Sequence, residues 1–296
     1  MKTYDHYRRL RESKSRDLDS TLQSLIKSIQ TALAGVVVDV ISDLVTDQDG
    51  AISTTVGNVT KQGRIGLVIK RETKRQAPRL IDRIVKGLGL ITRLNRLYFR
   101  AMPDVQPESV DERVIRKVLL RYGYDATTKQ VLPGGWLDSL SDNSALEQRV
   151  GNAIRQAIAA KTPLNDFKKQ FRADFTGANG LGYLEKHYET FVFDLHQQVD
   201  RQTQVEYADR LKLNHALYSG TIKDNTRPFC KARTGLVYTR DEIAGWENLN
   251  FQGKIKVGYN PFVHAGGYNC RHHLSWVSEL VAIRIAKGEK NINKYN

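Results

Sequence analysis

Apolar residues recur at three- and four-residue intervals through most of the first two thirds of the chain, which is the spacing of one face of an α-helix. The longest stripe runs over 22–44, and Asp19 or Ser20 is placed to cap the helix that it predicts. A stretch at 49–66 that contains glycine, serine and threonine interrupts the pattern. Further helices are predicted at 80–91, 110–119, 146–158, 167–175 and 181–211.

The composition of the sequence changes after Tyr218, where glycine, asparagine, proline and aromatic residues replace the helical pattern. Short strands are predicted at 235–238 and 255–259. The Thr-Arg-Asp-Glu segment at 239–242 has the form of a capping box, which predicts the start of a short helix. A last helix is predicted over 274–287, before a polar tail.

Together these patterns predict an α+β protein with a mostly α-helical N-terminal two thirds and a small α+β C-terminal module. We expect the helical region over 1–215, the module over 216–280, and a helix end with a polar tail over 281–296. The hydrophobic share of 40% is enough to build a buried core in a chain of 296 residues.

The charge balance favours polyanionic partners, because 46 lysines and arginines against 32 acidic residues give a formal net charge of +14. The longest apolar stretch, 33–44, is interrupted by Asp39 and falls short of the roughly 20 residues that span a bilayer. Charged residues also follow the N-terminus where a secretory signal is apolar. Two cysteines are too few for a disulfide framework. We therefore expect a soluble, unsecreted protein that contacts nucleic acid and no membrane.

Basic residues gather in three clusters, near the N-terminus, over 70–79 and over 93–100. In the second cluster they recur every four residues, which aligns them as ridges on a helix. Such ridges bind phosphates through counterion release with little sequence preference. The alternative role of each residue is a solvated surface. The residues predicted to contact DNA are Arg8, Arg9, Arg11, Lys70, Arg71, Lys74, Arg75, Arg79, Arg93, Arg96 and Arg100.

Both cysteines and three of the seven histidines fall in two short segments, 221–230 and 260–273. Zinc takes four nitrogen or sulfur ligands in a tetrahedron, usually from two clusters that the fold brings together. The candidate zinc ligands are Cys230, His264, Cys270 and His272, with His273 as a substitute for the last. Two alternatives stay open. One is a pair of buried thiols beside hydrogen-bonded histidines, and the other is a disulfide, which a cytosolic setting disfavours.

Polar residues near these segments are predicted to stabilise the module. Asp224 and Arg227 lie three residues apart on a predicted turn, where a carboxylate and a guanidinium can order a loop. Arg271 and Trp276 are expected to lock the module through a hydrogen-bonded or stacked arginine and a buried indole. An alternative places Asp224, Arg227 and the histidines in a general acid–base site with a cationic clamp for phosphate. The sequence has no P-loop or HExxH motif, which favours the structural roles.

The order of these motifs resembles a known family. The segment Asp224-x-Thr226-Arg227-x-x-Cys230 is followed by Gly-Leu-Val-Tyr and, after a variable stretch, by Gly-Tyr-Asn-Cys-Arg-His over 267–272. This order resembles the C-terminal domain of phage head-morphogenesis proteins, the minor head proteins of the Mu F type. The resemblance covers residues 218–278. His272 stands where the family usually has a second cysteine, which keeps a candidate metal ligand and removes one thiol.

The resemblance implies a structural protein of the bacteriophage virion without catalytic activity. It would be a minor head component held inside the capsid near the portal, and would lie in the host cytoplasm during assembly. The implied partners are the portal protein, the major capsid protein and packaged double-stranded DNA. Two other hypotheses stay open. One is a metal-dependent nucleic-acid-processing or toxin-like enzyme that uses the His/Cys-rich loop, and the other is a nucleic-acid-binding protein of a host or mobile element.

Overall fold

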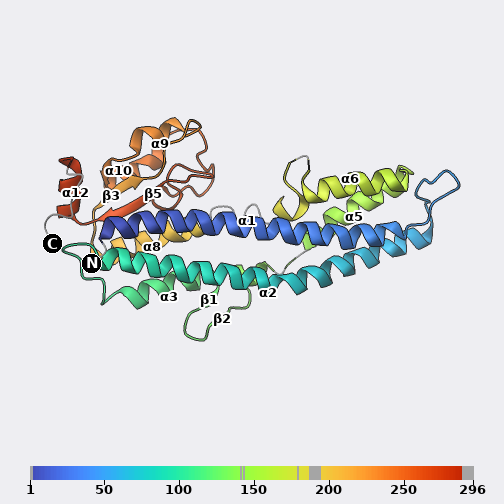
Figure 1. Cartoon of the computed structure of the whole chain (residues 1–296), viewed down its shortest axis with the longest axis horizontal. Coiled ribbons are helices and arrows are strands. Elements are labelled where there is room, and N and C mark those ends of the chain that lie inside the picture. The colour runs from blue at the N-terminus through green and yellow to red at the C-terminus, as the bar shows by residue number, and fades with distance from the viewer. Residues whose placement is uncertain (1–2, 141, 143, 179, 187–194, 289–296) are drawn as a thin grey trace. The chain divides into compact units, whose positions relative to one another are not determined.

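The computed structural model describes residues 3–140, 142, 144–178, 180–186 and 195–288. The fold is α+β and mostly helical, which confirms the fold class predicted from the sequence (Figure 1). Residues 187–194 of the helix predicted over 181–211 lie outside the described residues, and so does the predicted polar tail. The chain forms two compact units. The first unit comprises 1–20, 85–130 and 194–296, and the second comprises 21–84 and 131–193. The boundary predicted between the helical region and the module, near 215, falls inside the last segment of the first unit, 194–296.

The first long helix, α1 (Tyr4–Ser42), begins well before the cap predicted at Asp19. Asp5 in its first turn pairs with Arg8 and Arg9 at 2.7 Å and 2.9 Å, at the spacing that brings side chains together on a helix surface. A carboxylate near the N-terminus also favours the helix dipole. Asp19 consequently lies in mid-helix, where its carboxylate accepts instead from the His196 backbone amide at 2.8 Å.

The second long helix, α2 (Val56–Arg100), begins inside the stretch 49–66 that interrupts the sequence pattern. Ile65, inside that stretch, and Ile69, just after it, are buried and extend the apolar stripe of 80–91 toward the start of the helix. The Asn58 amide donates to two carbonyls of the preceding loop, at 2.9 Å and 2.7 Å, and thereby fixes where the helix starts. Both long helices contribute residues to both units.

The second unit adds short helices to its portions of α1 and α2. They are α4 (Trp136–Ser139), α5 (Ser144–Ala159) and α6 (Leu164–Thr176). α5 buries the residues of the predicted stripe, Leu146, Val150, Ile154 and Ile158. α6 buries Phe167, Phe171 and Phe175, which recur one helical turn apart. α6 follows Pro163 and ends at Gly177, whose φ of +78° gives the left-handed C-terminal cap that glycine adopts without strain.

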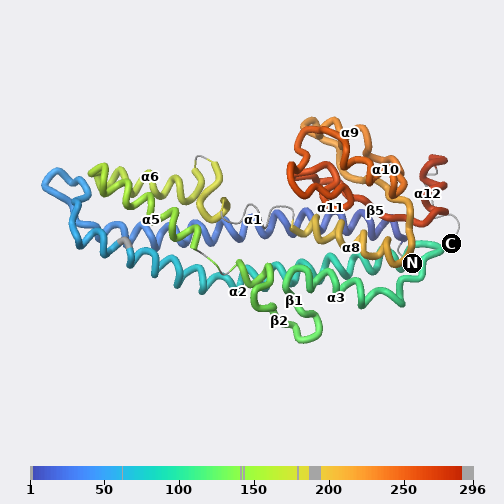
Figure 2. The backbone as a smooth tube through the Cα atoms, turned by 180° about the vertical axis from the view of Figure 1, so that it is seen from behind, coloured from blue at the N-terminus to red at the C-terminus, as the bar shows by residue number. Residues whose placement is uncertain are grey.

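In the first unit, α8 (Leu195–Leu211) packs against α3 (Asp111–Arg121) and against the C-terminal module (Figure 2). A small two-stranded sheet, β1 (Tyr124–Asp125) with β2 (Gln130–Val131), follows α3. α8 lacks an apolar face, and its buried residues include the polar set His196, Asp200, Arg201, Thr203 and Gln204. Buried polar groups must be hydrogen-bonded, so α8 brings a polar network into the core.

The module is built on a three-stranded antiparallel sheet with the strand order β4-β3-β5. Its strands are β3 (His215–Ser219), β4 (Val237–Thr239) and β5 (His273–Val277), and Leu217 of β3 pairs with Val237 on one side and Ser275 on the other. Short helices surround the sheet. They are α9 (Pro228–Arg233), α10 (Arg240–Gly245), the 3-10 turn η1 (Trp246–Asn248), α11 (Pro261–His264) and α12 (Glu279–Ala286).

Within the module, the predicted capping box is present, because Thr239 and Glu242 exchange hydrogen bonds at the start of α10. The predictions for 255–259 and for 274–287 were wrong in part. No strand forms over 255–259, which consists of bends and irregular loop. The last helix begins only at Glu279, because β5 takes the residues before it. All five β5 residues are buried, so they lack the alternation that identifies a strand.

Among the described helices, α1 is long and apolar enough by composition to cross a membrane. Only 39% of its most apolar 18-residue window is buried in the structure. A core helix of a soluble protein meets the same criterion of length and composition, so this single helix is weak evidence for a membrane span.

Candidate metal centre

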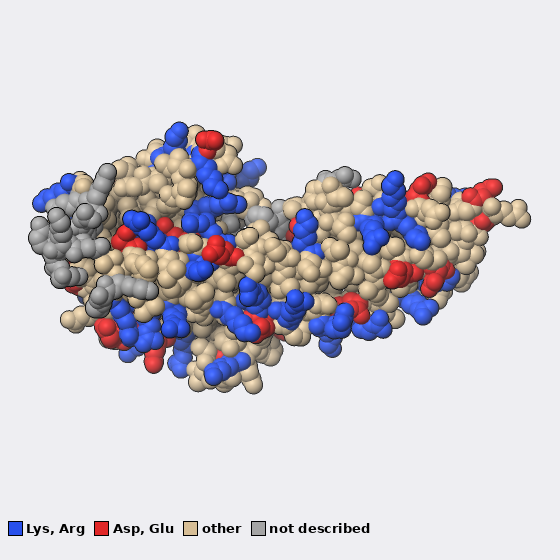
Figure 3. Space-filling view, viewed as in Figure 1, with Lys and Arg blue, Asp and Glu red and all other residues tan. Residues whose placement is uncertain are grey.

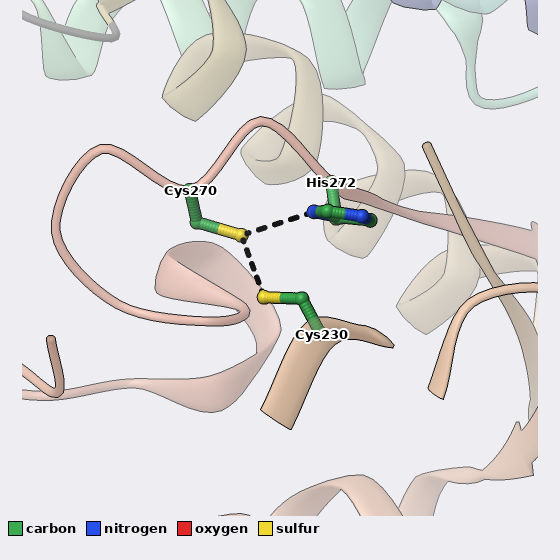
Figure 4. A group of neighbouring side chains, drawn as sticks. All are labelled: Cys230, Cys270 and His272. Carbon is green, nitrogen blue, oxygen red and sulfur yellow. Dashed lines mark hydrogen bonds between the residues drawn. The ribbon is translucent and has the colours of Figure 1, made fainter. Parts of the chain in front are cut away.

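Three side chains from distant parts of the sequence point toward one another inside the module (Figure 4). The Sγ atoms of Cys230 and Cys270 are 3.8 Å apart, and the Cys270 Sγ lies 3.9 Å from Nδ1 of His272. All three residues are buried, with exposed fractions of 2%, 2% and 4%. Two sulfurs and one imidazole nitrogen within 4.8 Å of one another form a group that could hold a metal ion.

Short, regular elements place these ligands. Cys230 lies in the first two turns of α9, whose first residue, Pro228, has the fixed φ that starts a helix. His272 comes directly before β5, so the central sheet sets its position. Cys270 lies between α11 and β5, in a loop whose backbone has a positive φ at Ala265 and at Asn269. The loop therefore turns sharply enough to bring Cys270 back over α9.

Two adjacent glycines allow this loop to close on the sulfurs. Gly266 N donates to the Cys270 Sγ at 3.2 Å. A Cβ at Gly266 would lie 2.3 Å from the Cys230 Sγ and 2.9 Å from the Cys270 Sγ, closer than atoms can approach. Gly267 has a φ of +88°, and a Cβ there would lie 2.0 Å from the Gly253 carbonyl oxygen. Only glycine fits at both positions.

Arg201 of α8 clamps the ligand-bearing loop. Its Nε donates to the His272 carbonyl at 3.0 Å and its Nη1 to the Val263 carbonyl at 3.1 Å. Its Nη2 donates to the Cys270 carbonyl. The side chain is 2% exposed, so these charge-assisted bonds satisfy carbonyls that have little contact with water. The sequence offered no signal for this role, because Arg201 lies in a helix far from both motifs.

Arg227 orders the same loop through other carbonyls. Its Nη1 donates to the Gly266 carbonyl at 2.8 Å, and its Nη2 donates to the Tyr268 carbonyl. Asp224 is exposed, and the turn that precedes Arg227 is closed instead by Thr226, whose Oγ1 accepts from the Lys223 amide at 2.8 Å. The predicted ordering role of Asp224 therefore falls to Thr226 and Arg227.

Aromatic side chains enclose the cluster. The Tyr218 ring stacks on His272 with centroids 5.3 Å apart, and it meets Trp246 edge-on at 5.6 Å.

Hydrogen bonding between the two thiols raises the pKa of Cys230 and lowers the pKa of Cys270, so Cys270 is the thiol that ionises first. Burial and hydrogen bonding favour a structural metal over a catalytic one, which keeps an open position.

Three other predicted residues lie outside the metal group. His264 is not among the clustered ligands, and its Nδ1 accepts from the Asn260 amide at 2.8 Å. Burial lowers its pKa. Arg271 is exposed and does not form the lock that we predicted, which Arg201 and Arg227 provide instead. Trp276 is 0% exposed, and the guanidinium of Arg240 lies 4.5 Å from its ring centroid.

A second buried polar cluster joins the start of α1 to α8 and β5. Arg11 Nη1 donates to the Asp200 carboxylate at 2.5 Å and Arg11 Nη2 to Ser275 Oγ at 2.6 Å. His273 Nδ1 lies 2.8 Å from the same carboxylate. Burial pushes the pKa of Asp200 up, but the Arg11 guanidinium and His273 bring it well below its usual range. Nearby, the Glu12 carboxylate accepts from Ser219 at 2.5 Å.

The DNA-contact prediction is wrong for Arg11, which is 0% exposed. Arg11 and Ser15 lie eleven and seven residues before Leu22, on the same helical face as the apolar stripe. Extending that stripe toward the N-terminus would have placed Arg11 in the core. The prediction treated the basic cluster as one surface and overlooked this periodicity.

The other basic residues divide into paired and exposed groups, and basic side chains are prominent on the face shown in Figure 3. Arg8 binds Asp5 and Glu12, and Arg9 binds Asp5. Arg96 and Arg100 both bind the buried carboxylate of Asp111. Arg71 and Arg75 flank Glu72 but stay 72% and 66% exposed. The remaining candidates, Lys70, Lys74, Arg79 and Arg93, are exposed.

No protein-family model matches this chain, and neither the curated proteins nor the solved structures contain a match. The resemblance to phage minor head proteins is therefore carried by the motifs of the module alone.

Proposed function

We propose that this chain is a structural minor head protein of a phage particle, of the Mu F type, whose C-terminal module is stapled by zinc. The observation that carries the proposal is the convergence of the family-like motifs. Arg227 of the first motif binds backbone carbonyls at 266 and 268, and Cys230 of the first motif meets Cys270 and His272 of the second. Residues of the two motifs that carry the resemblance thus contact one another in the folded chain.

Zinc fits this ligand set better than harder ions do. Thiolate and imidazole are soft or borderline ligands, whereas calcium and magnesium take oxygen. Cys230, Cys270 and His272 are buried, and the backbone amide of Gly266 donates to one of the sulfurs, as in zinc sites that stabilise a fold. In this role the metal would tie α9 to the loop that precedes β5.

Metal analysis tests the staple directly. Purified full-length protein should contain close to one equivalent of zinc. Cys270→Ser should release the metal and lower the melting temperature. His264→Ala is the matched control, because His264 lies outside the cluster, and it should keep the metal. A wild-type protein without metal, or Cys270→Ser with full occupancy and unchanged stability, would contradict the zinc proposal.

Contact with packaged DNA is the second part of the proposal. The net charge of +14 favours binding to phosphates. Lys70 and Lys74 lie on the exposed face of α2, one turn apart, with the exposed Arg79 following. The partners proposed from the resemblance are the portal and major capsid proteins, and the proposed location is the capsid interior or the portal vertex.

Particle composition tests the structural role. DNA-filled heads purified from a lysate of the strain that encodes the chain should contain this protein in fewer copies than the major capsid protein. It should co-sediment with heads after a high-salt wash that removes loosely bound cytosolic proteins. Tagged protein that is abundant in the lysate but absent from washed heads would overturn the proposal and favour a DNA-binding protein with no place in a particle.

A further inference from the structure

The candidate metal group supplies three ligand atoms, whereas zinc in structural sites is tetrahedral and takes four. A fourth polar atom already lies at the cluster. The Tyr218 hydroxyl oxygen, on β3, is 3.2 Å from the Cys230 Sγ and 3.7 Å from the Cys270 Sγ. Tyr218 is 0% exposed. This hydroxyl belongs to neither of the two sequence motifs.

Four distances within the cluster lie within about 0.4 Å of the edges of a zinc tetrahedron. Zinc–sulfur bonds of about 2.3 Å and zinc–nitrogen or zinc–oxygen bonds of about 2.0 Å require edges of about 3.8 Å between two sulfurs and about 3.5 Å from sulfur to nitrogen or oxygen. The two sulfurs are 3.8 Å apart, and the sulfur-to-Nδ1 distance from Cys270 to His272 is 3.9 Å. The two distances from the Tyr218 oxygen to the sulfurs are 3.2 Å and 3.7 Å, which lie on either side of the expected edge.

Backbone closes the face of the tetrahedron formed by the two sulfurs and the tyrosine oxygen. A Cβ at Gly266 would lie 2.3 Å, 2.9 Å and 3.1 Å from the Cys230 Sγ, the Cys270 Sγ and the Tyr218 oxygen respectively. The Gly266 backbone therefore covers all three atoms together. Protein backbone therefore lies against the side of the cluster where the phenol oxygen meets the two sulfurs.

We propose that Tyr218 Oη is the fourth ligand of this metal site, which gives a centre made of two cysteines, one histidine and one tyrosine. The inference rests on the zinc staple proposed above and adds a residue to it. When the ion binds, a metal–oxygen bond forms, the phenol O–H bond breaks, and the proton passes to solvent. The Tyr218 ring also stacks on the His272 ring, with an interplanar angle of 16°, so the same side chain packs against the imidazole ligand.

The experiment compares Tyr218→Phe with Tyr238→Phe in the full-length chain. Tyr238 lies on the neighbouring strand β4 and packs edge-on against Trp246, so it controls for loss of a hydroxyl from the same module. Metal-free protein is titrated with Zn²⁺ against a chelator of known affinity, and with Co²⁺ as a spectroscopic probe. We expect Tyr218→Phe to weaken Zn²⁺ binding by about tenfold or more and to shift the Co²⁺ ligand-field bands. Tyr238→Phe should change neither.

A second measurement on the unaltered protein keeps the inference testable if Tyr218→Phe fails to fold. Addition of Zn²⁺ to metal-free wild-type protein should produce the ultraviolet difference signal of a tyrosinate. An unchanged affinity and Co²⁺ spectrum in a folded Tyr218→Phe protein, or no tyrosinate signal in the wild type, would overturn the assignment of Tyr218. The zinc staple would survive either result if Cys270→Ser still lost the metal. Wild-type protein that binds neither ion would overturn both.

Discussion

Replacement of Arg201 by methionine removes the charged group that holds the loop with Cys270 and His272 to α8 and keeps only an unbranched apolar stem in place of the longer arginine. Arg201 donates to three carbonyls, those of Val263, Cys270 and His272. Hydrogen bonds from charged donors contribute about 1.5–3 kcal/mol each, and therefore roughly 4.5–9 kcal/mol for the three bonds. Removal of a buried charge also removes its desolvation cost. We therefore expect Arg201→Met to lower the free energy of unfolding of the first unit by about 3–5 kcal/mol.

Urea denaturation followed by tryptophan fluorescence measures this loss. The chain has three tryptophans, and Trp136 lies in the second unit. A Trp136→Phe background therefore leaves Trp246 and Trp276, both buried in the first unit, as the reporters. A single transition with an unchanged slope is needed for the comparison of free energies, because a chain with two units need not unfold in one step.

The neighbouring exposed arginine provides the matched control. Arg271→Met removes the same charge from the same loop, and surface substitutions of this kind usually change stability by less than about 0.5 kcal/mol. Arg201→Met should also weaken Zn²⁺ binding, because the loop that carries Cys270 and His272 loses its anchor. Equal stability of the two variants would refute the argument that buried carbonyls at these three positions depend on Arg201.

Three further changes give distinct outcomes. Gly266→Ala should expel the metal and lower the melting temperature, because its Cβ would lie 2.3 Å from the Cys230 Sγ. The control is Gly245→Ala, whose Cβ would meet nothing within 4 Å. It should leave the metal content unchanged. Asp200→Asn should cost about 3–5 kcal/mol at pH 7. The folded-state pKa of Asp200 is depressed, so its contribution to the free energy of unfolding is fully present above the unfolded-state pKa of about 3.9. That contribution is lost as the pH falls from there through the folded-state pKa. The stability of the variant should therefore decline less steeply with falling pH in acid denaturation curves. Lys70→Glu with Lys74→Glu should reduce the slope of log affinity for double-stranded DNA against log salt by up to about 1.8, and an unchanged slope would remove both lysines from the DNA interface.

Periodicity predicted the helices that have one apolar face. The stripes of α5 and α6 are buried as the spacing indicated, because a helix that packs on one side must repeat its apolar residues every three to four positions. α8 and β5 do not follow this rule. α8 buries polar residues on several faces, and β5 buries all five of its residues, so neither has the contrast between two faces on which a pattern depends.

The candidate site was predictable only where residue type is informative. Cysteine is rare in this chain, so the sequence indicated Cys230 and Cys270 as candidate metal ligands, together with His272 two residues after the second cysteine. Arg201 and Tyr218 reach the site from α8 and β3, and a single arginine or tyrosine in those segments has no distinguishing spacing. His264 was predicted by proximity in sequence, but α11 directs its ring nitrogen to its own helix start.

The family-like motifs account for only part of what holds the module together. Within 218–278, Ser219, His273 and Ser275 are buried polar residues, and their partners are the Glu12 carboxylate, the Asp200 carboxylate and the Arg11 guanidinium. Those partners come from α1 and α8, outside the range of the resemblance. Without them the module would bury unpaired polar groups, each at a cost of about 1–3 kcal/mol, and it would also lose the three bonds from Arg201. We therefore expect the module to depend on these two helices for its stability. The start of α1 and all of α8 complete its core, which is why they belong to the same compact unit as the module.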